Sequence, residues 1–224
     1  VLGRRLGQHF LARTSILERI ATAACGEKAP YVIEVGPGRG ALTEYLLPRC
    51  DQLAAIEVDT VLVHYLRQKF QSAIASGQLE LIEGDVLKTN LSRLHPRPVI
   101  AGNLPYYITS PILEKTFSLG SPSLDQGWER AVFLVQAEVA ERITASPGSR
   151  DFGYLSVLVQ VHSTPELLFP VSRSAFRPPP NVDSAVVRLT PRNAATELGI
   201  TNVPAFLKFA QQCFHMKRKT LRNN

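Results

Sequence analysis

The segment Asn103-Leu104-Pro105-Tyr106 carries the clearest chemical signal in the sequence. The amine of adenine is a poor nucleophile because its lone pair is delocalised into the ring. Two acceptors on its N–H bonds would localise that lone pair: the Asn103 side-chain oxygen, and the backbone carbonyl of Leu104 or Pro105. Tyr106 offers a ring on which a base can stack, a contact worth about 1–3 kcal/mol. The tetrapeptide therefore predicts a catalytic site for an adenine amine, although a plain proline turn can have the same sequence.

A second group of residues follows three successive predicted strands. Gly36, Gly38 and Gly40 form a turn in which the backbone can approach a ligand closely. Glu57 ends the next strand, where a carboxylate can accept both hydroxyls of a ribose. Asp85 follows the third strand and can accept a hydrogen bond from an adenine amino group. Each alone also fits an ordinary turn or a solvated strand end, but in this order they predict a pocket for an adenosine-bearing cofactor.

The elements that must position these residues are strands alternating with helices, which predicts an α/β fold with a mainly parallel sheet. Predicted strands cover residues 31–35, 53–56, 79–82, 98–101, 130–135, 166–169 and 184–189, the last two as a closing pair. Predicted helices cover about 41–48, 60–75 and 111–117, and residues 154–162 fit either a helix or a strand. Residues 174–180 form a loop stiffened by proline.

The charge of the chain favours a polyanionic partner. It has 25 lysines and arginines against 19 aspartates and glutamates, a formal net charge of +6. Residues 191–202 are expected to link to an amphipathic helix that begins at about Asn202. We predict that basic residues near the two ends of the chain bind RNA: Arg4, Arg5, Lys217, Arg218, Lys219 and Arg222. A solvated basic face is the common alternative.

Composition excludes several classes of protein. Hydrophobic residues make up 45% and charged residues 20%, which is ordinary globular usage rather than collagen-like or disordered. No apolar run reaches the roughly 18–20 residues that span a bilayer, so we expect no membrane association. Cys25, Cys50 and Cys213 lie far apart, and the histidines show no ligand spacing, so we expect neither a metal site nor disulfides. With no signal peptide visible, we expect a cytoplasmic monomer.

Taken together, these motifs resemble the class I S-adenosylmethionine-dependent methyltransferases, and within them the small-subunit rRNA adenine dimethyltransferases (the KsgA family). The resemblance covers almost the whole chain, on residues 7–11, 34–38, 56–59, 84–85, 103–111, 175–180, 182–187 and 218–223. It implies a Rossmann-like, mostly parallel seven-stranded sheet with helices on both faces. The methyltransferase domain would cover residues 1–192, and residues 193–224 would be a linker and a basic amphipathic helix opening a truncated C-terminal helical domain.

The resemblance also implies a role for each site residue. The residues implied to bind S-adenosyl-L-methionine are His9, Leu11, Gly36, Gly38, Glu57, Asp85 and Asn103. Asn103 would also hold the target amine, and Phe176 would close over the target base opposite Tyr106. The family often has Asn at the position of His9.

The implied reaction transfers methyl groups from S-adenosylmethionine to the amines of two adjacent adenines, each methylated twice. The implied substrate is small-subunit rRNA within an immature small ribosomal subunit. Two alternatives stay open: a large-subunit rRNA adenine methyltransferase of the macrolide-resistance type, and a non-catalytic RNA-binding assembly or transcription factor on the same fold. A nicotinamide oxidoreductase is disfavoured because the glycine spacing is GxGxG rather than GxGxxG. A DNA adenine methyltransferase is disfavoured because no segment is set aside for recognising a target sequence.

Overall fold

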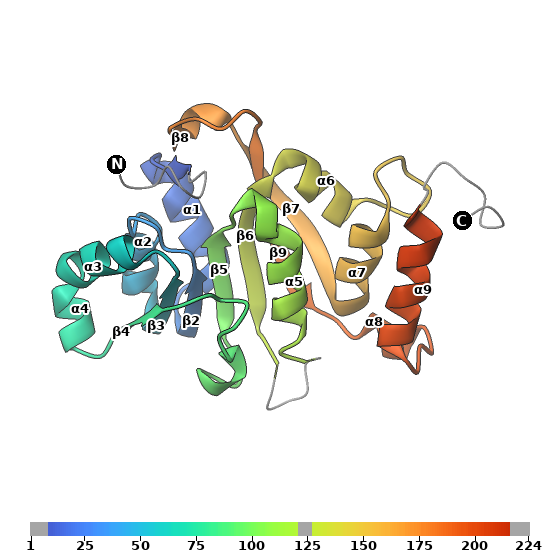
Figure 1. The fold of residues 1–224 in the computed structure, drawn as a ribbon, viewed down its shortest axis with the longest axis horizontal. Helices are drawn as coiled ribbons and strands as arrows, with labels where there is room; N and C mark the ends of the chain where they lie inside the picture. The colour runs from blue at the N-terminus through green and yellow to red at the C-terminus, as the bar shows by residue number, and fades with distance from the viewer. Residues whose placement is uncertain (1–8, 121–126, 216–224) are drawn as a thin grey trace.

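The computed structural model describes residues 9–120 and 127–215 of the chain. Within these residues, seven strands form one sheet in the order β4-β3-β2-β5-β6-β9-β7 (Figure 1). They are β2 (Ala29–Val35), β3 (Cys50–Glu57), β4 (Leu79–Glu83), β5 (Val99–Asn103), β6 (Arg130–Gln136), β7 (Ser163–Val171) and β9 (Ser184–Pro191). The neighbours from β4 to β6 are parallel, whereas β9 is antiparallel to both β6 and β7. The predicted seven-stranded, mostly parallel α/β sheet is confirmed.

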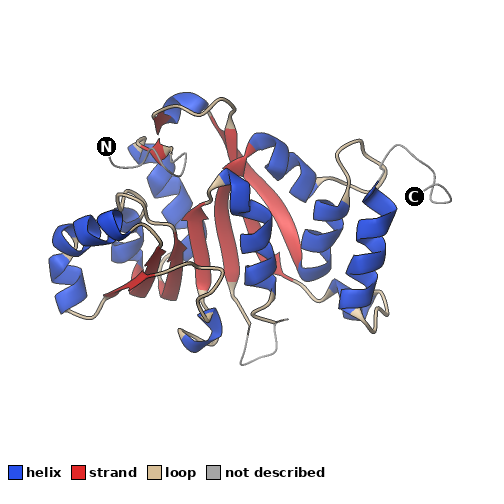
Figure 2. Ribbon diagram, in the orientation of Figure 1, coloured by secondary structure: helices blue, strands red, loops and turns tan. Residues whose placement is uncertain are grey.

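Helices cover both faces of this sheet (Figure 2). Side chains alternate across a strand, so Val32 and Val132 enter one apolar cluster while Ile33 and Phe133 enter the other. The first cluster is completed by α1 (Thr14–Cys25), α2 (Thr43–Leu46), α3 (Thr60–Lys69) and α4 (Gln71–Ala75), and the second by α5 (Thr109–Phe117), α6 (Ala137–Thr144) and α7 (Tyr154–His162). Burial on both faces explains the nearly continuous apolar runs of the central strands.

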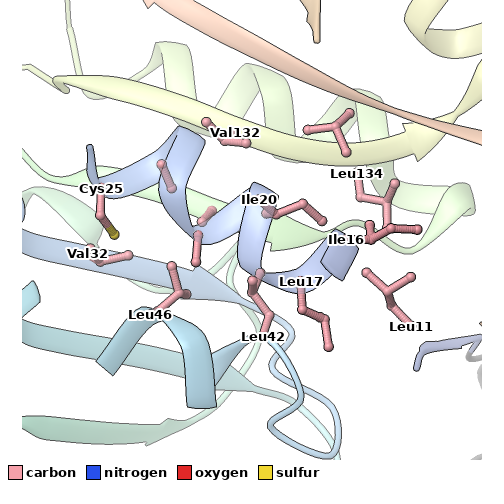
Figure 3. Close-up of a cluster of buried hydrophobic side chains, with 14 of the residues drawn as sticks. Leu11, Ile16, Leu17, Ile20, Cys25, Val32, Leu42, Leu46, Val132 and Leu134 are labelled. Carbon is pink, nitrogen blue, oxygen red and sulfur yellow. The ribbon is translucent and has the colours of Figure 1, made fainter. Parts of the chain in front are cut away.

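Helix α1 anchors the residues just before it, which include the short strand β1 (Phe10–Leu11), against the sheet. Its apolar residues recur at helical spacing, so Ile16, Leu17 and Ile20 are buried in the same cluster as Leu134 of β6 (Figure 3). Strand β1 pairs with β8 (Phe176–Arg177) in a separate two-stranded sheet. The first described residues are therefore held beside the loop that contains β8.

Two elements differ from the sequence-based prediction, and a third resolves a choice that the sequence left open. The predicted helix over residues 60–75 is broken at Phe70, which leaves the helical conformation and packs its buried ring against the glycine turn at Gly40. The predicted helix over residues 41–48 is only α2, followed by the 3-10 helix η1 (Leu47–Arg49). The ambiguous residues 154–162 form a helix, α7.

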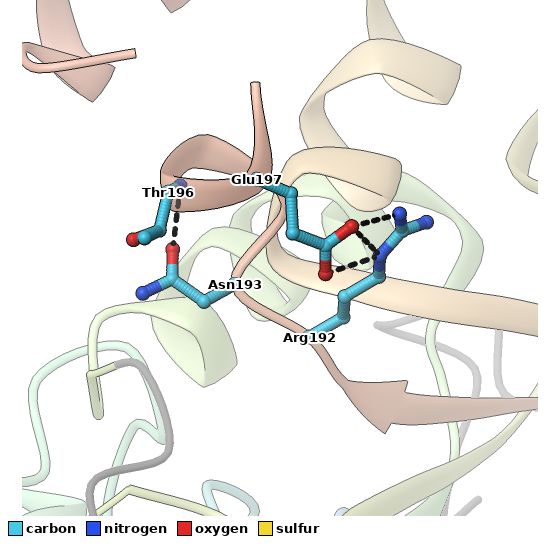
Figure 4. A network of polar contacts seen from close by, with 4 residues as sticks. All are labelled: Arg192, Asn193, Thr196 and Glu197. Atoms are coloured by element: carbon cyan, nitrogen blue, oxygen red, sulfur yellow. Dashed lines mark hydrogen bonds and ion pairs between the residues drawn. The ribbon is translucent and has the colours of Figure 1, made fainter. Parts of the chain in front are cut away.

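The predicted linker contains a short helix, α8 (Ala194–Glu197). Asn193 caps it by accepting a hydrogen bond from the Thr196 backbone N–H, and Arg192 forms an ion pair with Glu197 (Figure 4). Helices α8 and α9 (Val203–His215) both pack against α7. The division into domains at residues 192 and 193 stays a prediction.

The predicted RNA-binding residues Arg4, Arg5, Lys217, Arg218, Lys219 and Arg222 lie outside the described residues. Over the described ranges, no helix is long and apolar enough to cross a membrane. In the same ranges, no group of three or more His, Cys, Asp or Glu side chains could hold a metal ion.

Candidate active site

A pocket opens at the edge of the sheet where the parallel strands β2, β3, β4 and β5 end. Parallel strands place their carboxyl ends on one edge, so turns that are far apart in sequence meet there. Of the predicted site residues, those that line this pocket are His9, Leu11, Gly36, Gly38, Glu57, Asp85, Asn103, Leu104, Pro105 and Tyr106. The structure thus brings the predicted cofactor residues and the predicted catalytic tetrapeptide into one cavity.

The glycine turn after β2 needs glycine for two different reasons. Gly36 and Gly38 have φ of 64° and 60°, a left-handed conformation that other residues rarely adopt. A Cβ on Gly36 would meet no protein atom within 4 Å, so it would project into open space in the pocket. A Cβ on Gly38 would lie 3.0 Å from the Phe10 ring. Gly36 therefore leaves room for a ligand, and Gly38 leaves room for β1.

Glu57 is a buried carboxylate that is held by backbone donors. Its Oε1 accepts hydrogen bonds from the N–H groups of Val58 and Asp59, and its Oε2 accepts one from Gly38, each at 3.0 Å. Burial raises the pKa of Glu57, and these three hydrogen bonds oppose that rise. Because Oε2 accepts only one of them, it retains capacity for a ligand hydroxyl.

Asp85 occupies the next strand end. Its Oδ1 accepts a hydrogen bond from the Leu87 backbone N–H at 2.9 Å, which fixes the turn after β4. The residue is partly exposed and lines the pocket beside Gly84. A carboxylate oriented in this way can accept a hydrogen bond from an amino group on the ligand.

Glu34 is a pocket residue that the sequence reasoning missed. It is buried on β2 and accepts a hydrogen bond from the Thr43 hydroxyl at 2.7 Å. Burial, with a smaller contribution from the Glu57 charge, raises the pKa of Glu34 to about 7. The available signal was an acidic residue inside an otherwise apolar strand. Phe10 and Arg39 also line the pocket and were also missed.

Asn103, at the end of β5, has a defined amide orientation. Its Nδ2 donates a hydrogen bond to the backbone carbonyl of His9 at 3.1 Å. A carbonyl oxygen can only accept, so the amide N–H points at His9 and Oδ1 is left as an acceptor.

The structure also separates the two backbone carbonyls that the sequence left as alternatives. The Pro105 carbonyl accepts hydrogen bonds from the Ile108 N–H at 3.1 Å and the Thr109 hydroxyl at 3.3 Å. The Leu104 carbonyl accepts none from any described residue, although Leu104 is buried. Buried carbonyls normally have a donor, so the Leu104 carbonyl is the one suited to a ligand N–H.

Tyr106 is half-buried, and its ring faces the His9 ring at 6.1 Å between centroids and 26° between planes. The Tyr106 hydroxyl forms a hydrogen bond of 3.0 Å with Ser184. Burial raises the pKa of Tyr106, and the Ser184 hydrogen bond opposes that rise. The Nδ1 atom of His9 lies 2.9 Å from the carbonyl of Pro178, in the proline loop. Aromatic rings with fixed planes at the pocket mouth suit a flat base.

Phe176 does not lie where it was expected. Its side chain is 0% exposed and belongs to the apolar cluster that contains α1, so it has no free face opposite Tyr106. The physical reason is the pairing of β8 with β1. This pairing sets Phe176 opposite Leu11, and both side chains are buried in that cluster. In this arrangement Tyr106 and His9, rather than Phe176, present rings at the pocket.

The residues present fit an adenosine-bearing cofactor. The open space over Gly36, the buried carboxylate of Glu57 and the Asp85 side chain lie in the order that the sequence predicts. Next to them, Asn103 Oδ1 and the Leu104 carbonyl lack donors among the described residues. The cavity can therefore hold a nucleoside on one side and an amine that donates two hydrogen bonds on the other.

Comparisons with known proteins agree with this geometry. A family model for ribosomal RNA adenine dimethylase matches residues 2–224. The ribosomal RNA small subunit methyltransferase A of Acidobacterium capsulatum is 43% identical over 224 residues, which cover 98% of this chain and 76% of that protein.

Two solved structures are similar over nearly the whole chain. A dimethyladenosine transferase from Plasmodium falciparum has a TM-score of 0.79 and 32% identity, covering 96% of this chain and 74% of that one. The 23S rRNA methyltransferase ErmE has a TM-score of 0.72 and 28% identity, covering 95% of this chain and 86% of that one.

Proposed function

The chain belongs to the ribosomal RNA adenine dimethylase family and is an rRNA adenine dimethyltransferase; we propose that its pocket binds S-adenosylmethionine and that its substrate is the rRNA of an immature small ribosomal subunit. The observation that carries this proposal is the pair of acceptors at Asn103 and Leu104, which lie beside the predicted cofactor residues.

On the cofactor side, Glu57 would hold the ribose hydroxyls, Asp85 would accept from the adenine amino group, and the Gly36 turn would lie beneath the ligand. These roles are supported by the pocket lining and by the free acceptor capacity of Glu57 Oε2. When bound, S-adenosylmethionine supplies an electrophilic methyl group on a sulfonium. His9 and Leu11 would close the pocket from the β1 side.

On the substrate side, Asn103 Oδ1 and the Leu104 carbonyl would each accept one N–H of the target amine. Two acceptors localise the nitrogen lone pair and aim it toward the cofactor side of the pocket. Tyr106 would hold the base by stacking. A base splayed out of a single-stranded rRNA region could reach this pocket at low cost, because it has no partner strand to leave.

Arg39 lines the pocket, and Arg177 and Arg173 follow in the adjoining β8 loop; these arginines would bind the flanking RNA phosphates. The Arg39 guanidinium lies 4.9 Å from the centre of the Phe10 ring, and Phe10 pairs with Arg177 across β1 and β8. Arg173 lies in the same loop as Arg177.

No ion pair joins these three arginines to a carboxylate of residues 9–120 or 127–215. The Arg177 guanidinium donates to the carbonyls of Ser174 and Phe176, and the Arg173 guanidinium donates to the Asn181 carbonyl. No carboxylate of the described residues neutralises either charge, so the remaining N–H groups can pair with phosphate.

One observation supports the alternative substrate, large-subunit rRNA: the chain is similar to the 23S rRNA methyltransferase ErmE, at 28% identity. The small-subunit relative is 43% identical over 98% of this chain, so small-subunit rRNA is the better-supported substrate.

The test uses labelled S-adenosylmethionine with three substrates: naked small-subunit rRNA, immature small subunits and large-subunit rRNA. We expect dimethyladenine at two adjacent positions in the small-subunit RNA, with immature subunits as the best substrate. Label confined to large-subunit RNA would establish the alternative. Absence of both methyl transfer and cofactor binding would overturn the assignment of the pocket.

A further inference from the structure

Ser184 is a buried serine whose hydroxyl has one partner. It is the first residue of β9, it is 0% exposed, and it pairs with Gln136 at the end of β6. Its Oγ lies 3.0 Å from the hydroxyl oxygen of Tyr106, and no other described residue bonds to it through that hydroxyl. If the Tyr106 hydroxyl moved away, the buried Ser184 hydroxyl would have no hydrogen-bond partner among the described residues. That loss is costly, so the contact is strongly preferred.

This contact holds the Tyr106 side chain at its hydroxyl group. The Tyr106 backbone is held as well, because Tyr106 begins the 3-10 helix η3 (Tyr106–Ile108). A hydrogen bond from the Ile108 N–H to the Pro105 carbonyl closes this helix. With backbone and hydroxyl both held, the ring cannot turn about its Cα–Cβ bond without breaking a hydrogen bond. The plane that Tyr106 offers to a base is therefore set by Ser184 as well as by the turn.

We propose that Ser184 is a positioning residue for methyl transfer, which holds the plane of the Tyr106 ring so that the target adenine keeps its alignment through two successive transfers. This inference rests on the proposed function. The second transfer places a methyl group on a nitrogen that already carries one and has one N–H left for the two acceptors, so the alignment of the base depends more on the stacked ring. A ring that turns freely aligns the base less well for the second transfer.

The role predicts a change in the ratio of products. Loss of the Ser184 hydroxyl should slow the second transfer about threefold to tenfold, the range expected for losing one neutral hydrogen bond. Monomethyladenine would then accumulate, while cofactor affinity stays unchanged because Ser184 does not line the cofactor side. The product ratio is compared at equal total methyl transfer, so it does not depend on the fraction of protein that is folded.

The experiment compares Ser184→Ala, Tyr106→Phe and the double variant with Ser163→Ala. Ser163 is a matched control: it begins β7, is 1% exposed, and its hydroxyl donates to the Val159 carbonyl at 2.9 Å, away from the pocket. Immature small subunits are the substrate, and the amounts of mono- and dimethyladenine are followed with time. Both single variants should accumulate monomethyladenine, the double variant should be no worse than either, and Ser163→Ala should resemble wild type.

A Ser184→Ala ratio equal to that of Ser163→Ala would overturn the proposal. If Ser184→Ala does not fold, Tyr106→Phe still decides, because it removes the same hydrogen bond from the half-buried side and a wild-type ratio there refutes the role. Ser184→Thr, which keeps a hydroxyl, should restore the wild-type ratio. Failure of the proposed function is distinct, since wild-type protein would then form no dimethyladenine at all.

Discussion

The side-chain amide of Asn103 donates a hydrogen bond to the backbone carbonyl of His9, with 3.1 Å between nitrogen and oxygen. These residues are 94 positions apart in the chain. The contact leaves Asn103 Oδ1 as the acceptor for the target, so the β1 segment orients a group that would act on the substrate. His9 also contacts the Pro178 carbonyl, which joins the proline loop to the same arrangement.

Asn103→Ala should lower turnover about a hundredfold or more, equivalent to about 2.7–4 kcal/mol, because the variant lacks one preorganised acceptor for the amine. Cofactor affinity should change much less, because the acceptor acts mainly in the transition state. Single-turnover methylation of rRNA, with calorimetric titration of the cofactor in parallel, measures both. A variant that turns over normally would mean that the tetrapeptide is only a structural turn.

Asn103→Asp separates the two functions of the side chain. It keeps an acceptor for the substrate but has no N–H to donate to His9. We expect turnover to fall because the carboxylate cannot make this orienting hydrogen bond, while the protein remains folded. Full activity in this variant would show that the His9 contact is not needed.

Glu57→Gln should weaken cofactor binding about tenfold or more, since hydrogen bonds to charged groups contribute about 1.5–3 kcal/mol. Gln is preferable to Ala, because its one carbonyl oxygen can still accept from Val58 and Asp59, whereas Ala would leave all three backbone N–H groups without their acceptor. Glu83→Gln is the matched control, as Glu83 pairs with Glu57 on the neighbouring strand and does not line the pocket. Equal titration curves for the two variants would remove Glu57 from the binding site.

Gly36→Ala should weaken cofactor binding, whereas Gly77→Ala should not. Both glycines have positive φ, 64° and 77°, and neither Cβ would meet an atom within 4 Å. The backbone penalty should therefore be similar, about 1–2 kcal/mol in each variant. Only the Cβ on Gly36 enters the pocket. Thermal unfolding measures the shared penalty, and equal cofactor affinities in the two variants would contradict the role of Gly36.

Glu34 should make stability depend on pH. Burial raises the pKa of Glu34 to about 7 from an ordinary value of 4.5, so the folded state binds a proton that the unfolded state releases. The free energy of unfolding should therefore fall as pH rises from about 4.5 to 7, by about 3 kcal/mol at most. Glu34→Gln keeps an acceptor for Thr43 and should remove this fall. Urea unfolding of the wild type and of Glu34→Gln at pH 5 and pH 8 tests this prediction. If the free energy of unfolding changes by the same amount in both proteins, Glu34 is not the source of the pH dependence.

Neutralising the arginines of the β8 loop should reduce the salt dependence of RNA binding. For each phosphate of a single strand that an arginine no longer neutralises, the slope of log K against log salt should become less negative by about 0.7. We therefore expect a change of about 1.4 for Arg173→Gln combined with Arg177→Gln. A control that combines Arg67→Gln and Arg192→Gln should leave the slope unchanged, because those arginines already pair with Glu83 and Glu197. Equal slopes for the two double variants would place the RNA surface elsewhere.

The amino-acid sequence by itself determined the fold class and most of the pocket. Gly36, Glu57, Asp85 and Asn103 each follow a recognisable strand, and carboxyl ends of parallel strands must share one edge of the sheet. Their meeting was therefore predictable without any knowledge of side-chain contacts. Local pattern also predicted the closing strand pair and the turn at Pro105, and the structure shows that the pair is antiparallel.

Only the tertiary structure decided which acceptors remain free and which rings face the pocket. It assigned the Pro105 carbonyl to Ile108 and Thr109, left the Leu104 carbonyl without a donor among the described residues, and buried Phe176. The bond between Tyr106 and Ser184 joins positions 78 apart. Periodicity and turn propensity report on neighbours within a few residues, and the hydrogen bonds of the Pro105 carbonyl are of that local kind. The burial of Phe176 depends instead on the pairing of β8 with β1, and the Tyr106–Ser184 bond depends on the position of β9, which no local pattern encodes.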